Sequence, residues 1–327
     1  MSNLDLRPLS LGEILDRTFT LYRRNFLLFV GIVGLPYLLM LAMELVQTFL
    51  LLPGNLPVGE TTGPQQPPFS APTTTTIAST VVFYAAFIVV AILVYLLAQG
   101  ASVFAVSELY LGHTTTIRKS FQQMRGQMLR LFATVFLYFV LLAACFTVAM
   151  VPFFLIVGAA AAFGRTGAIF AVILAILLFF GGIFASIYLV CRFILVIPAT
   201  LLEDAGPVTA LRRSFALTRK NAGRAFLIIL ISVAITGAAA GVLMIPPYIG
   251  MLISLINHHF GMIRIWMALF QVGSFIGQAL AGPILIIATA VFYFDLRVRK
   301  EALDLQMMLG PEVNPGPVRG GVPTMLS

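Results

Sequence analysis

Gly206-Pro-Val-Thr-Ala-Leu-Arg-Arg-Ser-Phe-Ala-Leu-Thr-Arg-Lys-Asn-Ala-Gly-Arg224 is a basic stretch that leads directly into an apolar run beginning at Ala225. Pro207 suits the first turn of a helix, where its missing N–H costs nothing. Such a basic amphipathic helix lies in the headgroup layer of a membrane, and the apolar run that follows it then enters the bilayer. Helical spacing places Leu211, Phe215, Thr218 and Ala222 on one face, with Arg212, Arg213, Arg219, Lys220 and Arg224 around the rest.

Two other segments repeat this pattern. Residues 15–25 match residues 211–221 at six of eleven positions, and residues 117–125 form a third copy at an ungapped offset of 94 from the last. Basic juxtamembrane segments can look alike by composition alone, but the shared register favours true repetition. We therefore predict three units, each an interfacial helix followed by two spans, as in duplicated membrane bundles. The units are about 10–110, 111–205 and 206–300.

The composition excludes a soluble domain. The chain of 327 residues is 60% hydrophobic and only 10% charged. That balance is typical of an all-α polytopic membrane protein. The net charge of +8 points to lipid headgroups and membrane topology before nucleic acid. Cys145 and Cys191 lie in or at the ends of apolar runs, which indicates neither a disulfide framework nor a metal site.

Six spans are predicted within a membrane domain of residues 1–305. Ser10 and Glu13 form a capping box that starts the first interfacial helix, and the second covers about 114–130. We expect a flexible loop at 53–80 and a disordered cytoplasmic tail at 306–327. Residues 1–25 contain no apolar core of a cleavable signal peptide. The spans are about 26–52, 81–108, 131–157, 168–198, 225–250 and 265–294.

The bases predict the orientation. Eighteen of the twenty Lys and Arg residues flank or occupy the N-terminus, the connections between spans 2 and 3 and between spans 4 and 5, and the tail. Only Arg165 and Arg264 lie on the other side. The positive-inside rule then places both termini and all three basic helices in the cytoplasm, with the protein in the plasma (inner) membrane.

Membrane lipids with anionic headgroups are the predicted partners of the second and third basic helices. Each surface base contributes about 1 kcal/mol to such binding. A protein partner in the membrane is compatible with this pattern, whereas nothing indicates nucleic acid or a soluble substrate. The candidate headgroup ligands are Arg118, Lys119, Arg125, Arg130, Arg212, Arg213, Arg219, Lys220 and Arg224.

Glu44 is the one acidic residue well inside a predicted span. A charge at mid-span costs about 2.5–3.5 kcal/mol on insertion scales, so such a residue suggests an ion or proton site. The alternative, which we favour, is a protonated or hydrogen-bonded carboxyl inside the bundle, or one close enough to the outer surface to reach it. Its candidate polar neighbours are Gln99, Ser102, Gln271 and Gln278.

Acidic residues end spans 2, 4 and 6, and bases follow each of them. We predict that they form structural ion pairs that lock the interfacial helices to the spans. No nucleophile or metal cluster accompanies them, so no catalytic, cofactor or metal site is predicted; His258 and His259 alone are weak evidence. The acids are Glu108, Glu203, Asp204 and Asp295, and the candidate partners are Arg118, Arg192, Arg212, Arg297 and Arg299.

Three segments resemble a known family: Arg7-Pro-Leu-Ser-Leu-Gly-Glu-Ile-Leu-Asp16, Arg192 to Glu203 running into Ala210-Leu-Arg-Arg-Ser-Phe215, and Tyr293-Phe-Asp-Leu-Arg-Val-Arg-Lys-Glu301. Over residues 5–305 the chain is similar to the bacterial glycerophosphoryl diester phosphodiesterase membrane domain. A Gly commonly follows the last motif in that family, and Ala302 stands here. The family's name comes from chains fused to a soluble phosphodiesterase, for which this chain has no segment left.

The resemblance thus implies a six-span membrane domain of poorly defined role, without phosphodiesterase activity or assigned catalytic residues. Together with the basic helices, it favours a non-enzymatic membrane scaffold or lipid-interacting domain. The alternative is a small-solute or ion transporter or channel that uses Glu44. An enzyme ranks third, because the polar groups that a reaction needs do not converge in the sequence.

Overall fold

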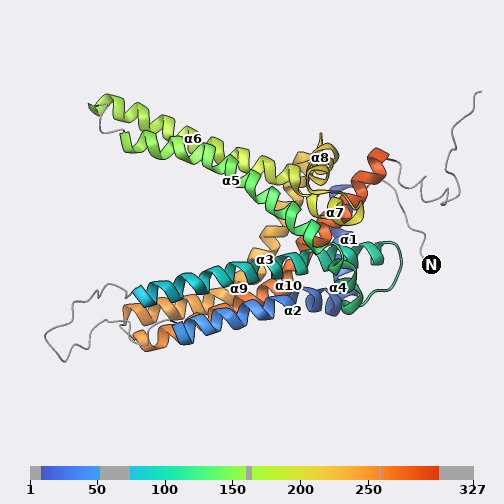
Figure 1. The fold of residues 1–327 in the computed structure, drawn as a ribbon, viewed down its shortest axis with the longest axis horizontal. Coiled ribbons are helices and arrows are strands. Elements are labelled where there is room, and N and C mark those ends of the chain that lie inside the picture. The colour runs from blue at the N-terminus through green and yellow to red at the C-terminus, as the bar shows by residue number, and fades with distance from the viewer. Residues whose placement is uncertain (1–8, 52–73, 160–163, 258, 302–327) are drawn as a thin grey trace, which may run out of the picture.

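The computed structural model describes residues 9–51, 74–159, 164–257 and 259–301, and these residues contain helices but no strand (Figure 1). Long apolar helices alternate with short amphipathic ones. The helices are α1 (Leu11–Arg24), α2 (Phe26–Val46), η1 (Gln47–Leu51, a π-helix), α3 (Thr74–Tyr110), α4 (Ile117–Arg125), α5 (Met128–Ala159), α6 (Gly164–Phe193), α7 (Val196–Leu202), α8 (Pro207–Thr218), α9 (Ala222–Ile256) and α10 (Phe260–Glu301).

Six of these helical segments are long and apolar enough to cross a membrane. The prediction of an all-α polytopic membrane protein is therefore confirmed. Several helices exceed the predicted spans: α3 begins at Thr74, so residues 74–80 are helical and do not belong to a loop. The rest of the predicted loop, and the tail at 306–327, lie outside the described residues.

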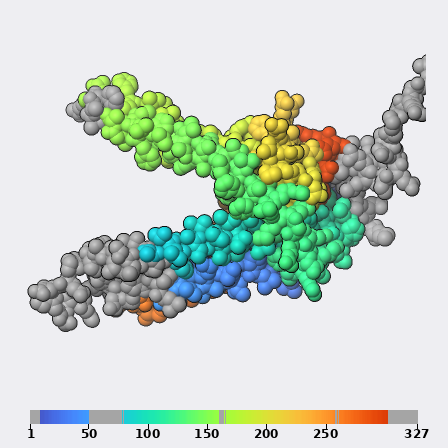
Figure 2. All heavy atoms as spheres, viewed as in Figure 1, coloured from blue at the N-terminus to red at the C-terminus, as the bar shows by residue number. Residues whose placement is uncertain are grey.

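Helix α10 is the centre of the molecule. In its most apolar stretch 61% of residues are buried, against 6–17% in the other five spans. It packs against α9, α2, α1 and α3. The hairpin of α5 and α6 instead leaves this bundle as a separate arm. Figure 2 shows the hollow between this hairpin and the bundle. The helix pairs of the three predicted units therefore do not pack equivalently.

Close packing of α9 on α10 depends on two glycines. A Cβ built at Gly277 would lie 2.9 Å from the Cα of Ala240, and one at Gly273 would lie 2.9 Å from the carbonyl oxygen of Leu243. The backbones meet because neither glycine has a side chain, as in other small-residue helix contacts. Gly237 on α9, in contrast, has no atom within 4 Å of such a Cβ.

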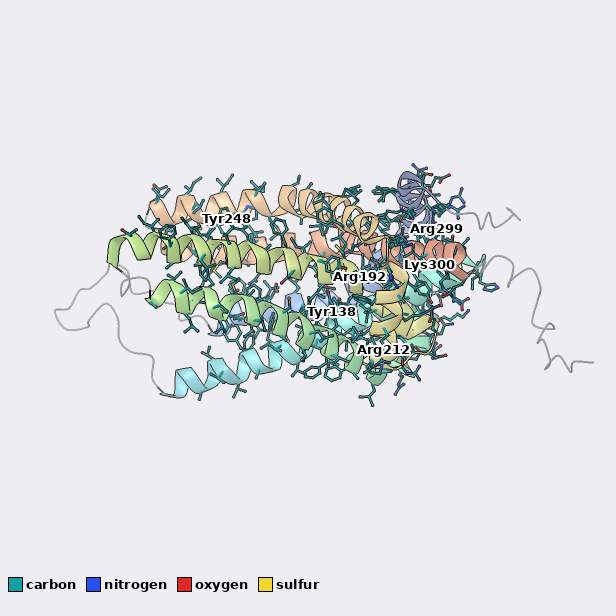
Figure 3. The ribbon with its side chains drawn as sticks, turned by 90° about the horizontal axis from the view of Figure 1, so that it is seen from above. Tyr138, Arg192, Arg212, Tyr248, Arg299 and Lys300 are labelled. Atoms are coloured by element: carbon teal, nitrogen blue, oxygen red, sulfur yellow. The ribbon has the colours of Figure 1, made fainter. Side chains whose placement is uncertain are left out.

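The short helices α1, α4, α7 and α8 gather with the last turns of α10 at one end of the molecule, which we call the basic end (Figures 1 and 3). The predicted capping box starts α1, because Ser10 Oγ accepts from the N–H of Glu13, and the Ser10 N–H donates to the Glu13 carboxylate at 2.6 Å.

Two predicted boundaries at this end are wrong. The fourth apolar run breaks after Phe193, and α7 starts a new helix at Val196. Pro198 explains the break: it has no N–H for the carbonyl of Ile194, and its ring clashes with that carbonyl in a continuous helix. The predicted interfacial helix at 114–130 is shorter, because α4 ends at Arg125 and α5 begins at Met128.

Candidate functional site

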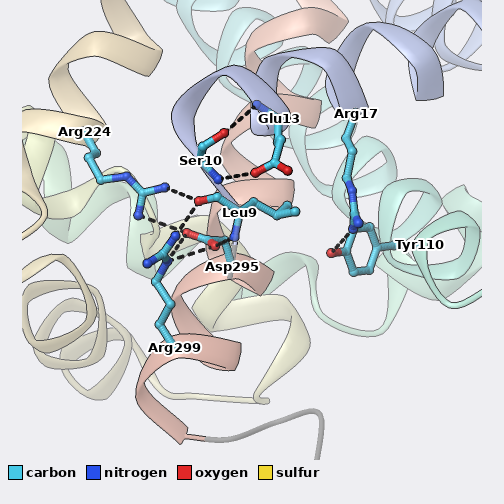
Figure 4. Close-up of polar contacts among 8 residues, drawn as sticks. All are labelled: Leu9, Ser10, Glu13, Arg17, Tyr110, Arg224, Asp295 and Arg299. Atoms are coloured by element: carbon cyan, nitrogen blue, oxygen red, sulfur yellow. Dashed lines mark hydrogen bonds and ion pairs between the residues drawn. The ribbon is translucent and has the colours of Figure 1, made fainter. Parts of the chain in front are cut away.

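Asp295 is the centre of a buried polar cluster at the basic end (Figure 4). Its carboxylate is 1% exposed and accepts from the Leu9 N–H at 2.7 Å, from Arg224 at 3.1 Å and from Arg299 at 3.0 Å. Both arginines also donate to the Leu9 carbonyl. Residues from three distant parts of the chain thus share one charge-assisted network, which fastens the start of α1 to α9 and α10.

A second cluster surrounds Glu203. Arg213 Nε lies 2.7 Å from its carboxylate, Tyr293 donates its hydroxyl at 2.6 Å, and Arg297 Nε lies at 3.9 Å. Glu301 contacts both arginines from the last turn of α10. Burial lowers the pKa of Arg213, but the hydrogen bonds and charges of the two carboxylates more than offset this and raise it overall. The guanidinium therefore remains charged and joins α8 to α10.

The remaining acids form exposed pairs. Glu108 contacts Lys119 Nζ at 3.1 Å, and Asp204 contacts Arg130 at 2.9 Å. The predicted structural ion pairs therefore exist at all four acids, but most of the predicted partners are wrong. Of the predicted partners Arg297 and Arg299 lie within 4 Å of one of these carboxylates, in the part of the chain that the structure describes, whereas Arg118, Arg192 and Arg212 do not.

Arg192 is the clearest departure from the predicted pairing. It is 4% exposed, and no carboxylate of the described residues forms an ion pair with it. Its guanidinium stacks on the Phe215 ring, 3.6 Å from the centroid, and the hydroxyls of Ser214 and Thr218 donate to its carbonyl. The buried face of α8 therefore runs through Ser214 and not, as predicted, through Phe215, which is 43% exposed.

The nine predicted headgroup ligands fall into two classes. Lys119, Arg130, Arg213 and Arg224 are engaged with carboxylates of the protein itself. The other five are exposed and form no ion pair with any carboxylate within the described ranges. These unpaired bases are Arg118, Arg125, Arg212, Arg219 and Lys220.

Glu44 lines a pocket of about 440 Å³ between α2, η1, α3, α9 and α10, in the half of the bundle away from the basic end. Gln47, Gln271 and Ser274 line it too, and Gln271 donates to Thr48 at 2.8 Å. Of the predicted neighbours only Gln271 shares this pocket. Gln278 faces outward on α10, and neither Gln99 nor Ser102 lines the pocket.

The helical rise explains the misplaced neighbours on α3. Glu44 lies about 27 Å along its helix from the basic end of α2, whereas Gln99 lies only about 17 Å from the basic end of α3. The two side chains are therefore at different depths of the bundle. Two side chains meet only if they lie at the same depth in the bundle and point toward each other. The sequence pattern predicted neither property correctly.

Metal-binding clusters of three or more His, Cys, Asp or Glu side chains are absent from the described residues. His258 lies outside those residues, as does the side chain of Arg165. Cys145 and Cys191 are free thiols.

A family model described as a family of unknown function (DUF7544) matches residues 25–298. No curated protein and no solved structure matches the chain. These findings do not link the chain to the glycerophosphoryl diester phosphodiesterase membrane domain, and that resemblance stays a prediction. Because the matched segment covers most of its length, the chain belongs to the DUF7544 family.

Proposed function

We propose that this protein is a non-enzymatic membrane domain that binds anionic lipids at its basic end and acts there as a membrane scaffold. The observation that carries the proposal is the set of five exposed, unpaired bases on α4, α8 and the turn after α8. The protein's own carboxylates neutralise the other four bases and so make them structural. An anionic bilayer surface is the partner that complements the five remaining charges.

The orientation follows the same proposal. We infer that the basic end lies in the cytoplasm of a bacterial cell, with the spans in the inner membrane, because bases concentrate on the cytoplasmic side of membrane proteins. The likeness to the bacterial phosphodiesterase-associated membrane domain supports this placement. It also agrees with a role in the membrane that needs no catalytic residues.

Replacing the five unpaired bases with Gln is expected to lower the anionic lipid that copurifies with the protein by about tenfold or more, since each base contributes about 1 kcal/mol. The measurement is the ratio of phosphatidylglycerol to phosphatidylcholine bound to protein extracted in mild detergent from vesicles of both lipids. The native protein should also lose anionic lipid at high salt. If the unmodified protein binds phosphatidylglycerol and phosphatidylcholine in the same ratio as the vesicles contain them, preferential binding of anionic lipid is refuted.

The pocket at Glu44 supports a second candidate function, transport of protons or a small solute. An intramembrane carboxyl beside Gln47, Gln271 and Ser274 can serve as a binding group, because polar residues in spans mark ion pathways. In proteoliposomes with an internal pH dye, Glu44→Gln would then abolish proton flux, while Gln278→Ala, on an outward face, would leave it intact. Equal flux through empty liposomes and protein-containing ones would exclude proton transport.

A further inference from the structure

A pocket of about 530 Å³ lies between the end of α6 and the length of α8. Four of its lining residues are apolar or small: Phe193, Leu211, Phe215 and Ala216. The other two are Arg212 and Arg219, both exposed and both among the five unpaired bases. The spacing of the five residues from α8 and its C-cap places them on one side of the helix, so the pocket has apolar walls and two guanidinium groups together.

A buried cation adjoins this pocket, because Arg192 contacts the lining residue Phe215. Arg192 stacks on the face of Phe215, and its Nε has no hydrogen-bond partner among the described residues. Buried charges are normally paired, because burial without a counter-charge is costly. The Phe215 ring offsets part of that cost through its quadrupole. An anion in the adjoining pocket, near Arg212 and Arg219, would bring negative charge closer to this buried cation.

Two lysines add positive charge at the end of α8. Lys300 Nζ donates to the carbonyls of Ala216 and Arg219, at 2.9 and 3.1 Å. Lys220 follows in a left-handed conformation, with φ at 69°. Figure 3 shows Arg192, Arg212 and Lys300 at the same end of the molecule. Five cations thus lie on or beside the second half of α8, while the carboxylates of Glu203 and Glu301 are already engaged by Arg213 and Arg297.

We propose that this pocket binds a single anionic glycerophospholipid, with its phosphate against Arg212 and Arg219 and one acyl chain against Phe193, Leu211 and Phe215. The inference rests on the proposed function and makes it specific, because it assigns one built site in place of a diffuse basic surface. The apolar walls favour a lipid over free phosphate, which has no group to cover them. The volume is in the range of small-molecule binding sites.

The test titrates the detergent-solubilised full-length protein with phosphatidylglycerol, phosphatidylcholine or inorganic phosphate, and reads the first bound ligand by native mass spectrometry. Arg212→Gln with Arg219→Gln is expected to weaken the first phosphatidylglycerol by about 30-fold, or about fivefold for each base. The matched control, Arg118→Gln with Arg125→Gln, removes the same charge from α4 and should change this affinity by less than about twofold. Ala216→Trp, which fills the pocket without changing charge, should weaken the lipid by about tenfold or more.

Each other outcome overturns the specific site. If the two double variants lose lipid equally, binding is diffuse, and the proposed function stands without this pocket. Inorganic phosphate that binds as tightly as phosphatidylglycerol would show a site for a free anion. Loss in the Arg212 and Arg219 variant without loss in Ala216→Trp would exclude the acyl-chain position. If the native protein does not prefer phosphatidylglycerol to phosphatidylcholine, the proposed function fails with the site.

Discussion

Asp295→Asn is expected to destabilise the protein by about 3 kcal/mol, the lower end of the range for breaking a buried ion pair. The carboxylate is buried, and its loss leaves Arg224 and Arg299 close together without a counter-charge. The lower end applies because these arginines are 24% and 34% exposed, so water compensates part of the loss. The measurement is the free energy of unfolding from a denaturant titration in mixed micelles, followed by circular dichroism.

Asp204→Asn is the matched control for that substitution. Asp204 also pairs with an arginine, Arg130, but its side chain is 72% exposed. Exposed pairs contribute less than about 1 kcal/mol. The backbone of Asp204 has a φ of 52°, a conformation that Asn also tolerates, so the control adds no backbone strain. Equal losses in both variants would show that the Asp295 network does not hold the basic end together.

Gly277→Val is expected to destabilise the protein by about 3 kcal/mol, at the upper end of the usual cost of overpacking. The new Cβ would lie 2.9 Å from the Cα and Cβ of Ala240. The backbone of Ala240 cannot move away from the new side chain as a flexible side chain could. Helices α9 and α10 must therefore separate and lose contacts along their length. The same denaturant titration measures the effect, and a crosslink between Cys substitutions across the two helices would report their separation.

Gly237→Val provides the comparison on the facing helix. No atom lies within 4 Å of a Cβ at Gly237, so the side chain points into open space. The helix then gains slightly in stability, because Val has a somewhat higher helix propensity than Gly. A large loss of stability in this variant, or none in Gly277→Val, would contradict the assignment of Gly273 and Gly277 as the contact face.

The sequence by itself determined the class of protein and the positions of its main elements. Apolar runs set the six spans, because the transfer of each residue into a membrane depends mainly on its own side chain. The capping box at Ser10 and Glu13 was equally local, since both residues belong to one turn. The presence of ion pairs at the span ends also followed, because acids and bases meet there in the sequence.

Only the tertiary structure decided which charges are paired. Asp295 and Arg299 lie one turn apart on α10, a spacing that the sequence shows, but only the fold brings Arg224 from α9 to the same carboxylate. The stacking of Arg192 on Phe215 is also a tertiary result, because the neighbouring helices decide which face of α8 is buried. Free bases and paired bases look alike in sequence, and the fold separates them because pairing depends on distance in space.

The central place of α10 was also a tertiary result. All six spans are apolar enough for the membrane, so hydropathy could not distinguish the central helix α10 from the separate hairpin of α5 and α6. Glycines at 273 and 277 allow α9 to approach closely, whereas the glycines at 237 and 241 do not form this contact. Membrane helices associate through shape rather than through hydrophobicity, and shape complementarity exists only once the helices are together.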